Sequence, residues 1–271
     1  MSTVLEVGDL RVAYPGRGFR GRPHEVLHGV SLTVGQGETL GVVGESGSGK
    51  TTIGRSVLGL VAPSGGTVRF QGHDITRAGR KERRALARDI QVVFQDPYSS
   101  LNPGLTIGDI LSEPLIVQGT AAGEARHRVA ELLDQVGLPK NASQRLPREF
   151  SGGQRQRVAI ARALAPAPRL IVCDEPVSAL DLTTQARVLD LLVDIQRRTG
   201  VAYLFISHDL TVIRHVSHRV SVIHQGNIVE TGPAGEVTTT PEHPYTQRLL
   251  LAAPVPDPTE QRRRREARQR L

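Results

Sequence analysis

The chain has 271 residues, a net charge of +7 and a hydrophobic content of 38%, which predicts a packed globular protein rather than a disordered chain. No apolar run reaches the roughly 18 residues of a membrane-spanning helix, and the N-terminus lacks the basic-then-apolar layout of a signal peptide. Because Cys173 is the one cysteine, an internal disulfide and a metal site built on several thiolates are excluded, and we expect a cytoplasmic protein.

Apolar runs typical of strands alternate with helical stretches along the chain. Several of them are continuous β-branched runs without alternation, as expected of strands buried on both faces of an α/β sheet. A stretch with helical spacing, TIGRSVLGLV, covers residues 52–61. The predicted strands are VSLTV (30–34), ETLGVV (38–43), TVRF (67–70), IQVVF (90–94), LIVC (170–173), AYLF (202–205) and RVSVI (219–223).

Residues 105–165 interrupt this alternation and read as mostly helical, for example in EARHRVAELLDQVG (124–137). We expect a helical subdomain, at about 96–165, inserted between strands of a core domain that covers residues 1–240. Proline-rich sequence at 241–258 begins a C-terminal appendage that runs to residue 271.

The stretch GESGSGKTT (44–52) carries the first chemical signal. It matches the phosphate-binding P-loop pattern Gly44-x-x-x-x-Gly49-Lys50-Thr51, with an apolar strand before it and a helix after it. Glycines allow the backbone N–H groups to curl around phosphate, and the helix start adds its positive dipole end. Lys50 would reach the β- and γ-phosphates of a nucleotide, and the Thr51 hydroxyl would bind Mg²⁺. A glycine-rich connector is the alternative, but it does not account for Lys50 in a chain with three lysines.

A second signal is RLIVCDEP (169–176), an apolar strand that ends in two carboxylates. Asp174 is placed for a water-mediated contact to Mg²⁺, and Glu175 would lie beside the γ-phosphate and polarise a water molecule. Alone, such a strand end could equally form a salt bridge. We interpret Cys173 as a buried filler rather than a redox group.

The sequence FSGGQRQRVAIARAL (150–164) resembles the signature of ABC-transporter ATPases. The other motifs of this family follow in the expected order over nearly the whole chain. The resemblance implies an α/β P-loop NTPase fold with a RecA-like parallel-sheet core, N-terminal antiparallel strands and an inserted helical subdomain. It implies ATP-binding roles for Tyr14, Gly44, Glu45, Ser46, Gly47, Ser48, Gly49, Lys50, Thr51, Thr52 and Gln95, and metal roles for Thr51, Gln95 and Asp174.

The resemblance also implies the hydrolytic residues. Glu175 would be the general base, His208 in FISHDL would hold the γ-phosphate and the attacking water, and Gln95 would link the site to the helical subdomain. Tyr14 would stack on adenine, although Phe19 competes for that role. The SALD sequence matches the D-loop, with Ser178, Ala179, Leu180 and Asp181.

The signature has a physical logic of its own, since Ser151 can cap the following helix while Gly152 and Gly153 leave its N–H groups open to an anion. The family implies that two cassettes dimerise head to tail. Each ATP would then lie between one P-loop and the partner's signature residues, which are Ser151, Gly152, Gly153 and Gln154.

The sequences VFQDPYSSLNP (93–103) and HPYTQRLLLAAPVPDP (243–258) resemble the ATPase subunits of dipeptide, oligopeptide and nickel importers. The cysteine cluster of some members is absent, so an iron–sulfur centre is not expected. The implied protein is an importer ATPase for dipeptides or oligopeptides that lies at the cytoplasmic face of the membrane, with nickel or another solute as the alternative cargo. Its expected partners are a second ATPase subunit, identical or related, two permease subunits and, indirectly, a solute-binding protein, with ATP and Mg²⁺ as ligands.

Three alternatives remain open at this point: a soluble ABC ATPase that acts on nucleic acid or ribosomes, a small-molecule P-loop kinase, and an exporter ATPase. The first draws on the C-terminal residues QRRRREARQRL (261–271), which hold +5 of the total charge. We interpret this segment as a solvated tail and expect no nucleic-acid partner. Deletion of residues 261–271 distinguishes the two readings by its effect on RNA or DNA binding.

Overall fold

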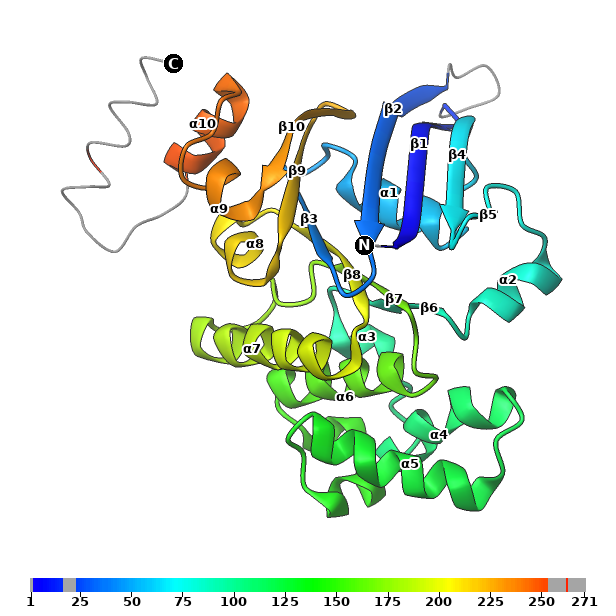
Figure 1. The fold of residues 1–271 in the computed structure, drawn as a ribbon. Coiled ribbons are helices and arrows are strands. Elements are labelled where there is room, and N and C mark those ends of the chain that lie inside the picture. Colours follow the sequence, from blue (N-terminus) through cyan, green and yellow to red (C-terminus); the bar gives the residue numbers. More distant parts are fainter. Residues whose placement is uncertain (1, 17–22, 253–261, 263–271) are drawn as a thin grey trace. The chain divides into compact units, whose positions relative to one another are not determined.

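The structure is a computed structural model that describes residues 2–16, 23–252 and 262 (Figure 1). The chain forms two compact units: the first combines residues 1–78 with 204–271, and the second covers residues 79–203. Phe19, the predicted alternative to Tyr14 for adenine stacking, lies outside the described residues. So does most of the predicted arginine-rich tail at 261–271.

The first unit contains a four-stranded antiparallel sheet in the order β2-β1-β4-β5. Buried and exposed side chains alternate along β1 (Thr3–Tyr14) and β2 (His24–Gly35), as expected of strands with one face on a core. Their register pairs Leu5 with Val34 and Val12 with Leu27. The shorter strands β4 (Gly65–Phe70) and β5 (His73–Asp74) complete the sheet, which confirms the predicted N-terminal antiparallel strands.

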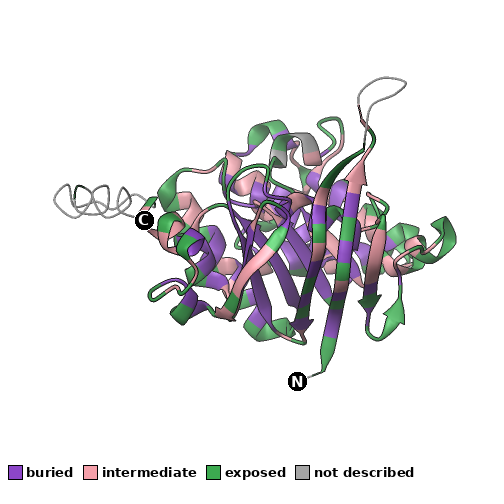
Figure 2. Ribbon diagram, turned by 90° about the horizontal axis from the view of Figure 1, so that it is seen from above, coloured by how far each residue is buried: buried purple, intermediate pink, exposed green. Residues whose placement is uncertain are grey.

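The same unit contains strands that are buried on both faces. Every residue of β3 (Thr39–Val43) and of β8 (Ala202–Ser207) is buried, and β8 belongs to this unit from Leu204 onward, whereas Ala202 and Tyr203 belong to the second unit. The interior strands appear purple in Figure 2. The strand order here is β10 (Asn227–Pro233), β9 (Arg219–His224), β3 and β8. Strand β9 pairs with β3 in parallel and with β10 in antiparallel orientation. The helices of this unit are α1 (Lys50–Val57), α8 (Leu210–Val216), α9 (Ala234–Val237) and α10 (Pro244–Ala252).

The second unit combines the parallel pair β6 (Ile90–Val93) and β7 (Leu170–Asp174) with most of the helices. Its longest helix, α7 (Leu182–Thr199), begins at an Asp181 side chain that accepts from the Thr184 N–H and ends at Gly200 with φ of 68°. The remaining helical elements are α2 (Arg80–Leu86), α3 (Pro97–Ser100), α4 (Ile107–Val117), α5 (Ala122–Gln135), η1 (Lys140–Gln144), η2 (Pro147–Glu149) and α6 (Gly152–Leu164).

The predicted strands are all present, and the helical block expected at about 96–165 contains α3 to α6. The helix predicted to start near Lys50 and to extend through the helical spacing of 52–61 begins where expected, but it ends earlier, because α1 covers Lys50–Val57. Gly59 adopts φ of 72°, a left-handed conformation that ends helices, and the Leu60 N–H turns back to the Arg55 carbonyl. The boundary at residue 240 between core and appendage stays a prediction.

Two glycines of the first unit with similar backbone angles provide a matched test of crowding. Gly226 has φ of 76°, and a Cβ there would lie 2.3 Å from the Val26 carbonyl oxygen; Gly72 has φ of 79° and open space. We expect Gly72→Ala to lower the free energy of unfolding by about 1–2 kcal/mol through the left-handed backbone alone. Gly226→Ala should cost about 2–5 kcal/mol, because the crowding of the carbonyl adds to the same backbone cost.

Chemical denaturation of the two variants measures this difference. Equal losses for Gly72→Ala and Gly226→Ala would show that the close approach of Gly226 to Val26 is relieved without cost.

Candidate functional site

The P-loop connects the end of β3 to the start of α1, as the sequence predicts. Gly47 and Gly49 have φ of 80° and 106°, values that side-chain-bearing residues rarely adopt. At Gly44 a Cβ would lie 2.2 Å from the Ile223 carbonyl oxygen and 2.9 Å from Ser48 Oγ, so no larger residue fits there. The glycines therefore allow a tight loop whose backbone can face a ligand.

Lys50, the first residue of α1, is 4% exposed. Its ammonium group donates to the carbonyl oxygens of Gly44 and Glu45, each at 2.8 Å. An ammonium group has three donors and no acceptor, so it can donate to these two carbonyl oxygens and to one further acceptor. This buried charge needs an anionic or carbonyl partner, which fits the expected contact with phosphate.

Ser48 lies at the point where the β9–β10 turn meets the P-loop. The Gly226 N–H donates to the Ser48 carbonyl oxygen at 3.1 Å, and the Gly226 carbonyl oxygen accepts from the His28 N–H at 3.0 Å. Ser48 Oγ is buried and has no hydrogen-bond partner among the described residues. A buried hydroxyl without a partner is costly, and a bound phosphate oxygen would satisfy it.

Two other predicted residues belong to this first unit. Tyr14 ends β1, and its hydroxyl lies 3.4 Å from Thr52 Oγ1 on α1, so this ring lies close to the P-loop helix. His208 is exposed and follows β8 directly. The adenine-stacking role of Tyr14 and the phosphate role of His208 stay predictions.

In the second unit, the predicted carboxylates lie at the end of β7. Asp174 is the last residue of the strand, and Glu175 adopts φ of 51°. A left-handed backbone is uncommon outside glycine, and such residues cluster at functional sites. The turn is fixed by Ser178, whose N–H and hydroxyl both donate to the Glu175 carbonyl oxygen.

The signature forms the start of α6, as predicted. Ser151 Oγ accepts from the Gln154 N–H at 3.3 Å, and Gln154 Oε1 accepts from the Ser151 N–H at 3.0 Å, which together make a capping box. Gly153 packs against α7, where a Cβ would lie 2.1 Å from Thr184 Cγ2. Gly152 has room for a Cβ, with Leu180 Cδ2 at 3.6 Å.

The structure thus brings the signature and the predicted D-loop together at the starts of α6 and α7. Asp181 caps α7, and hydrogen bonds from the side chain and backbone of Thr184 lower the pKa of its carboxyl. Gln95 is exposed, between β6 and α3. Gln95, the carboxylates after β7, the signature and the D-loop all belong to the second unit, whereas the P-loop, Tyr14 and His208 belong to the first.

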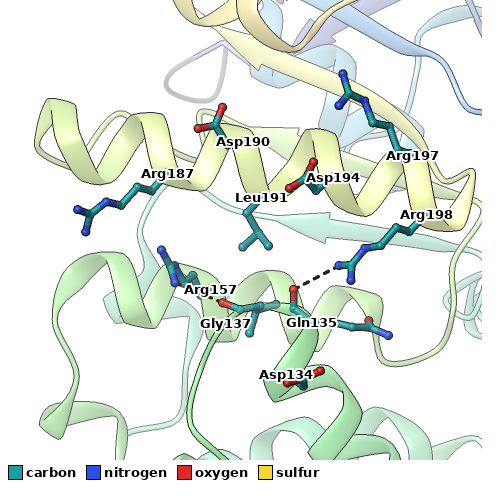
Figure 3. Close-up of a pocket in the computed structure, with 11 residues that line it drawn as sticks. Asp134, Gln135, Gly137, Arg157, Arg187, Asp190, Leu191, Asp194, Arg197 and Arg198 are labelled. Atoms are coloured by element: carbon teal, nitrogen blue, oxygen red, sulfur yellow. Dashed lines mark hydrogen bonds between the residues drawn. The ribbon is translucent and has the colours of Figure 1, made fainter.

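The second unit also contains a cavity of about 640 Å³ between α7, the C-terminal end of α5 and Arg157 of α6 (Figure 3). Arg157 donates to the Val136 carbonyl oxygen and Arg198 to that of Gln135. The charged residues that line the cavity are Asp134, Asp190, Asp194, Arg157, Arg187, Arg197 and Arg198. The opposite charges nearly cancel, and no predicted site residue lines the cavity.

One contact of the P-loop was missed by sequence reasoning. The Tyr245 hydroxyl on α10 accepts a hydrogen bond from the Glu45 N–H at 3.0 Å, although the two residues are 200 positions apart. The sequence HPYTQRLL predicts only membership of the importer subfamily, through its resemblance to those ATPases. No local pattern connects it with the P-loop.

Cys173, the residue before the last one of β7, is fully buried, and burial raises the pKa of its thiol far above its ordinary value. We expect no reaction of the folded protein with iodoacetamide and complete reaction after unfolding in guanidinium, because the thiolate is the reactive form. Mass spectrometry of the alkylated chain measures both. Rapid labelling under native conditions would show that β7 opens to solvent.

Among residues 2–16, 23–252 and 262, no helix combines the length and the hydropathy that crossing a bilayer requires. Over the same ranges, no group of three or more His, Cys, Asp or Glu side chains is placed to hold a metal ion by itself.

P-loop nucleotide-binding proteins are defined by a buried strand, a glycine-rich loop that contains a lysine, and a helix that begins directly after the loop. Residues 27–178 match the family described as "ABC transporter", and residues 229–271 match "Oligopeptide/dipeptide transporter, C-terminal region". The chain belongs to the ABC transporter family. The predicted family and fold are therefore confirmed.

Three curated relatives illustrate the likeness. The oligopeptide transport ATP-binding protein OppD of Mycobacterium tuberculosis is 52% identical over 86% of this chain, and the glutathione import ATP-binding protein GsiA of Escherichia coli K12 is 50% identical over 97%. The chain spans only 38% and 43% of the lengths of these two proteins. The oligopeptide transport ATP-binding protein OppF of Lactococcus lactis is 47% identical over 99% of this chain and 86% of its own length.

Two solved structures have the same fold. The cbiO1 protein of Clostridium perfringens, described as part of the ABC transporter complex cbiONQ, has a TM-score of 0.79 at 28% identity over 89% of this chain and 92% of its own. The ATP-binding cassette MJ0796, in a dimeric post-hydrolysis state with ADP and Pi, has a TM-score of 0.76 at 30% identity over 85% and 98%.

Proposed function

We propose that this chain binds and hydrolyses ATP to drive an ABC importer of peptides. The observation that carries the proposal is the presence, in one chain, of the P-loop geometry and of a C-terminal segment matching the oligopeptide/dipeptide transporter region. The relatives described above are named as ATP-binding proteins of oligopeptide transport and glutathione import, which supports a peptide cargo.

ATP binding would rest on groups that the first unit already places at the loop. Lys50 has a buried charge that can move from two carbonyl oxygens to phosphate oxygens, and Ser48 Oγ is a buried hydroxyl for a further oxygen. The Thr51 hydroxyl would hold Mg²⁺, with Gln95 and Asp174 as the other proposed contributors. When bound, this ion would neutralise phosphate charge. The Tyr14 ring, held near Thr52, would stack on the base.

Hydrolysis would depend on Glu175, which accepts a proton from the attacking water as general base. The Ser178 contacts that hold the turn would keep this carboxylate at a fixed place after β7. His208 would hold the water and the γ-phosphate, and Gln95 would connect the nucleotide with the helical segment that follows β6.

The proposed working form pairs this chain with a second ATPase subunit, identical or related, so that Ser151 and the helix start of α6 face the partner's nucleotide. The dimeric form of MJ0796 supports such pairing. The pair would be peripheral, at the cytoplasmic face of the membrane, bound to two permease subunits. Cargo would be selected by those subunits and by a solute-binding protein.

Disulfide crosslinking tests the proposed pairing. Ser46 is exposed in the P-loop and Gly152 has room for a side chain, so a Ser46→Cys chain mixed with a Gly152→Cys chain should form a covalent dimer with ATP and Mg²⁺ under mild oxidation. The native Cys173 is buried and should not form crosslinks of its own. Each variant alone is the control, because head-to-tail pairing keeps like positions apart. Crosslinking that is absent, or independent of ATP, would contradict the pairing.

A further inference from the structure

The residues that link α10 to the P-loop form a chain of contacts within the first unit. Glu230 on β10 accepts from the N–H groups of Glu242 and His243, at 2.9 and 3.2 Å, and so fixes the segment before the helix. His243 Nδ1 then accepts from the Tyr245 N–H at 3.1 Å. These contacts fix the first turn of α10 relative to β10.

Tyr245 is built into this site rather than lying on its surface. It is 3% exposed, and its ring stacks on that of His224, the last residue of β9, with centroids 3.9 Å apart and planes at 30°. Burial is the main cause that raises the pKa of its phenol, so the hydroxyl is neutral at physiological pH. A neutral phenol can accept from an N–H group, which is what its contact with Glu45 requires.

The peptide groups around Glu45 are held from two sides. Lys50 donates to the carbonyl oxygens of Gly44 and Glu45, and Tyr245 accepts from the Glu45 N–H between them. A phosphate that binds in the loop competes with these carbonyl oxygens for the Lys50 ammonium. When Lys50 turns to the phosphate, the Tyr245 hydroxyl remains to hold this part of the loop.

We propose that Tyr245 is a positioning residue for ATP binding, through which the docking of α10 and the occupancy of the P-loop are coupled. The inference rests on the proposed ATP binding. Because coupling between two equilibria is reciprocal, ATP should stabilise docked α10 by the same factor by which docked α10 tightens ATP binding. The C-terminal segment is then part of the nucleotide site, and a partner that displaces it would weaken ATP binding.

The test removes the hydroxyl and keeps the ring. Tyr245→Phe should bind a non-hydrolysable ATP analogue about 2- to 10-fold more weakly, the range that one ordinary hydrogen bond supports. The KM for ATP should rise by a similar factor with kcat nearly unchanged. Tyr203→Phe is the matched control: it also removes a buried tyrosine hydroxyl, which donates to the Leu192 carbonyl oxygen at 3.2 Å, but in the second unit.

Hydrogen exchange of the wild-type chain gives a second readout that needs no variant. The ATP analogue should slow exchange in α10 by about 2- to 10-fold, and this effect should be lost in Tyr245→Phe. Unchanged affinity in Tyr245→Phe, an equal loss in Tyr203→Phe, or no effect of the analogue on α10 would overturn the inference while wild-type binding still supports the proposed function. Failure of the wild-type chain to bind the analogue would overturn both.

Discussion

Glu175→Gln should lower the rate of ATP hydrolysis by about 100- to 10,000-fold, the usual effect of removing a general base. The amide keeps the size and shape of the side chain but cannot accept the proton of the attacking water. ATP binding should be retained, because the proposed phosphate contacts come from the P-loop. Release of inorganic phosphate, measured beside the Kd of an ATP analogue, separates the two effects.

Glu124→Gln is the control, since this exposed carboxylate on α5 has no role in the proposed chemistry. It should hydrolyse ATP at the wild-type rate. If Glu175→Gln also retained that rate, the carboxylate at the end of β7 would not be the base.

Lys50→Ala should weaken the binding of ATP by about 10- to 140-fold. A hydrogen bond to a charged group contributes about 1.5–3 kcal/mol, and 1.4 kcal/mol corresponds to a factor of ten in Kd. Lys50 is the buried cation of the loop, and its loss also releases the carbonyl oxygens of Gly44 and Glu45. Isothermal titration with an ATP analogue measures the change.

The chain offers its own comparison, because the remaining lysines are exposed: Lys81 on α2 and Lys140 in η1. Alanine at either position should leave the Kd for the analogue unchanged. Equal weakening by Lys81→Ala would indicate a general effect of charge rather than a phosphate contact.

The P-loop and the signature could be predicted because their chemistry lies in consecutive residues. Gly44 to Thr52 carry the loop within nine positions, and Ser151 to Gln154 carry the helix cap within four. In both places the local backbone preference of the residues agrees with the final fold. The structure therefore has the loop and the cap at the predicted positions.

The contact between Tyr245 and Glu45 could not be predicted in this way. It depends on β9, whose pairing with β3 brings His224 and the β9–β10 turn to the P-loop. A contact over 200 positions follows from that pairing and from the anchoring of the Glu242–His243 segment by Glu230. None of these steps has a local sequence signal. The end of α1 could not be predicted for a different reason, because the apolar spacing of 52–61 continues past Gly59, whose left-handed backbone ends the helix.

The backbone at Glu175 has a consequence for how this chain can change over time. Its φ of 51° suits glycine or asparagine better than glutamate, at a cost of about 1–3 kcal/mol. Selection for stability alone would therefore disfavour glutamate at this position, so its presence is explained by the proposed role of the carboxylate in hydrolysis. In a related chain that no longer hydrolyses ATP, we expect glycine or asparagine to replace glutamate at this position and to raise the free energy of unfolding.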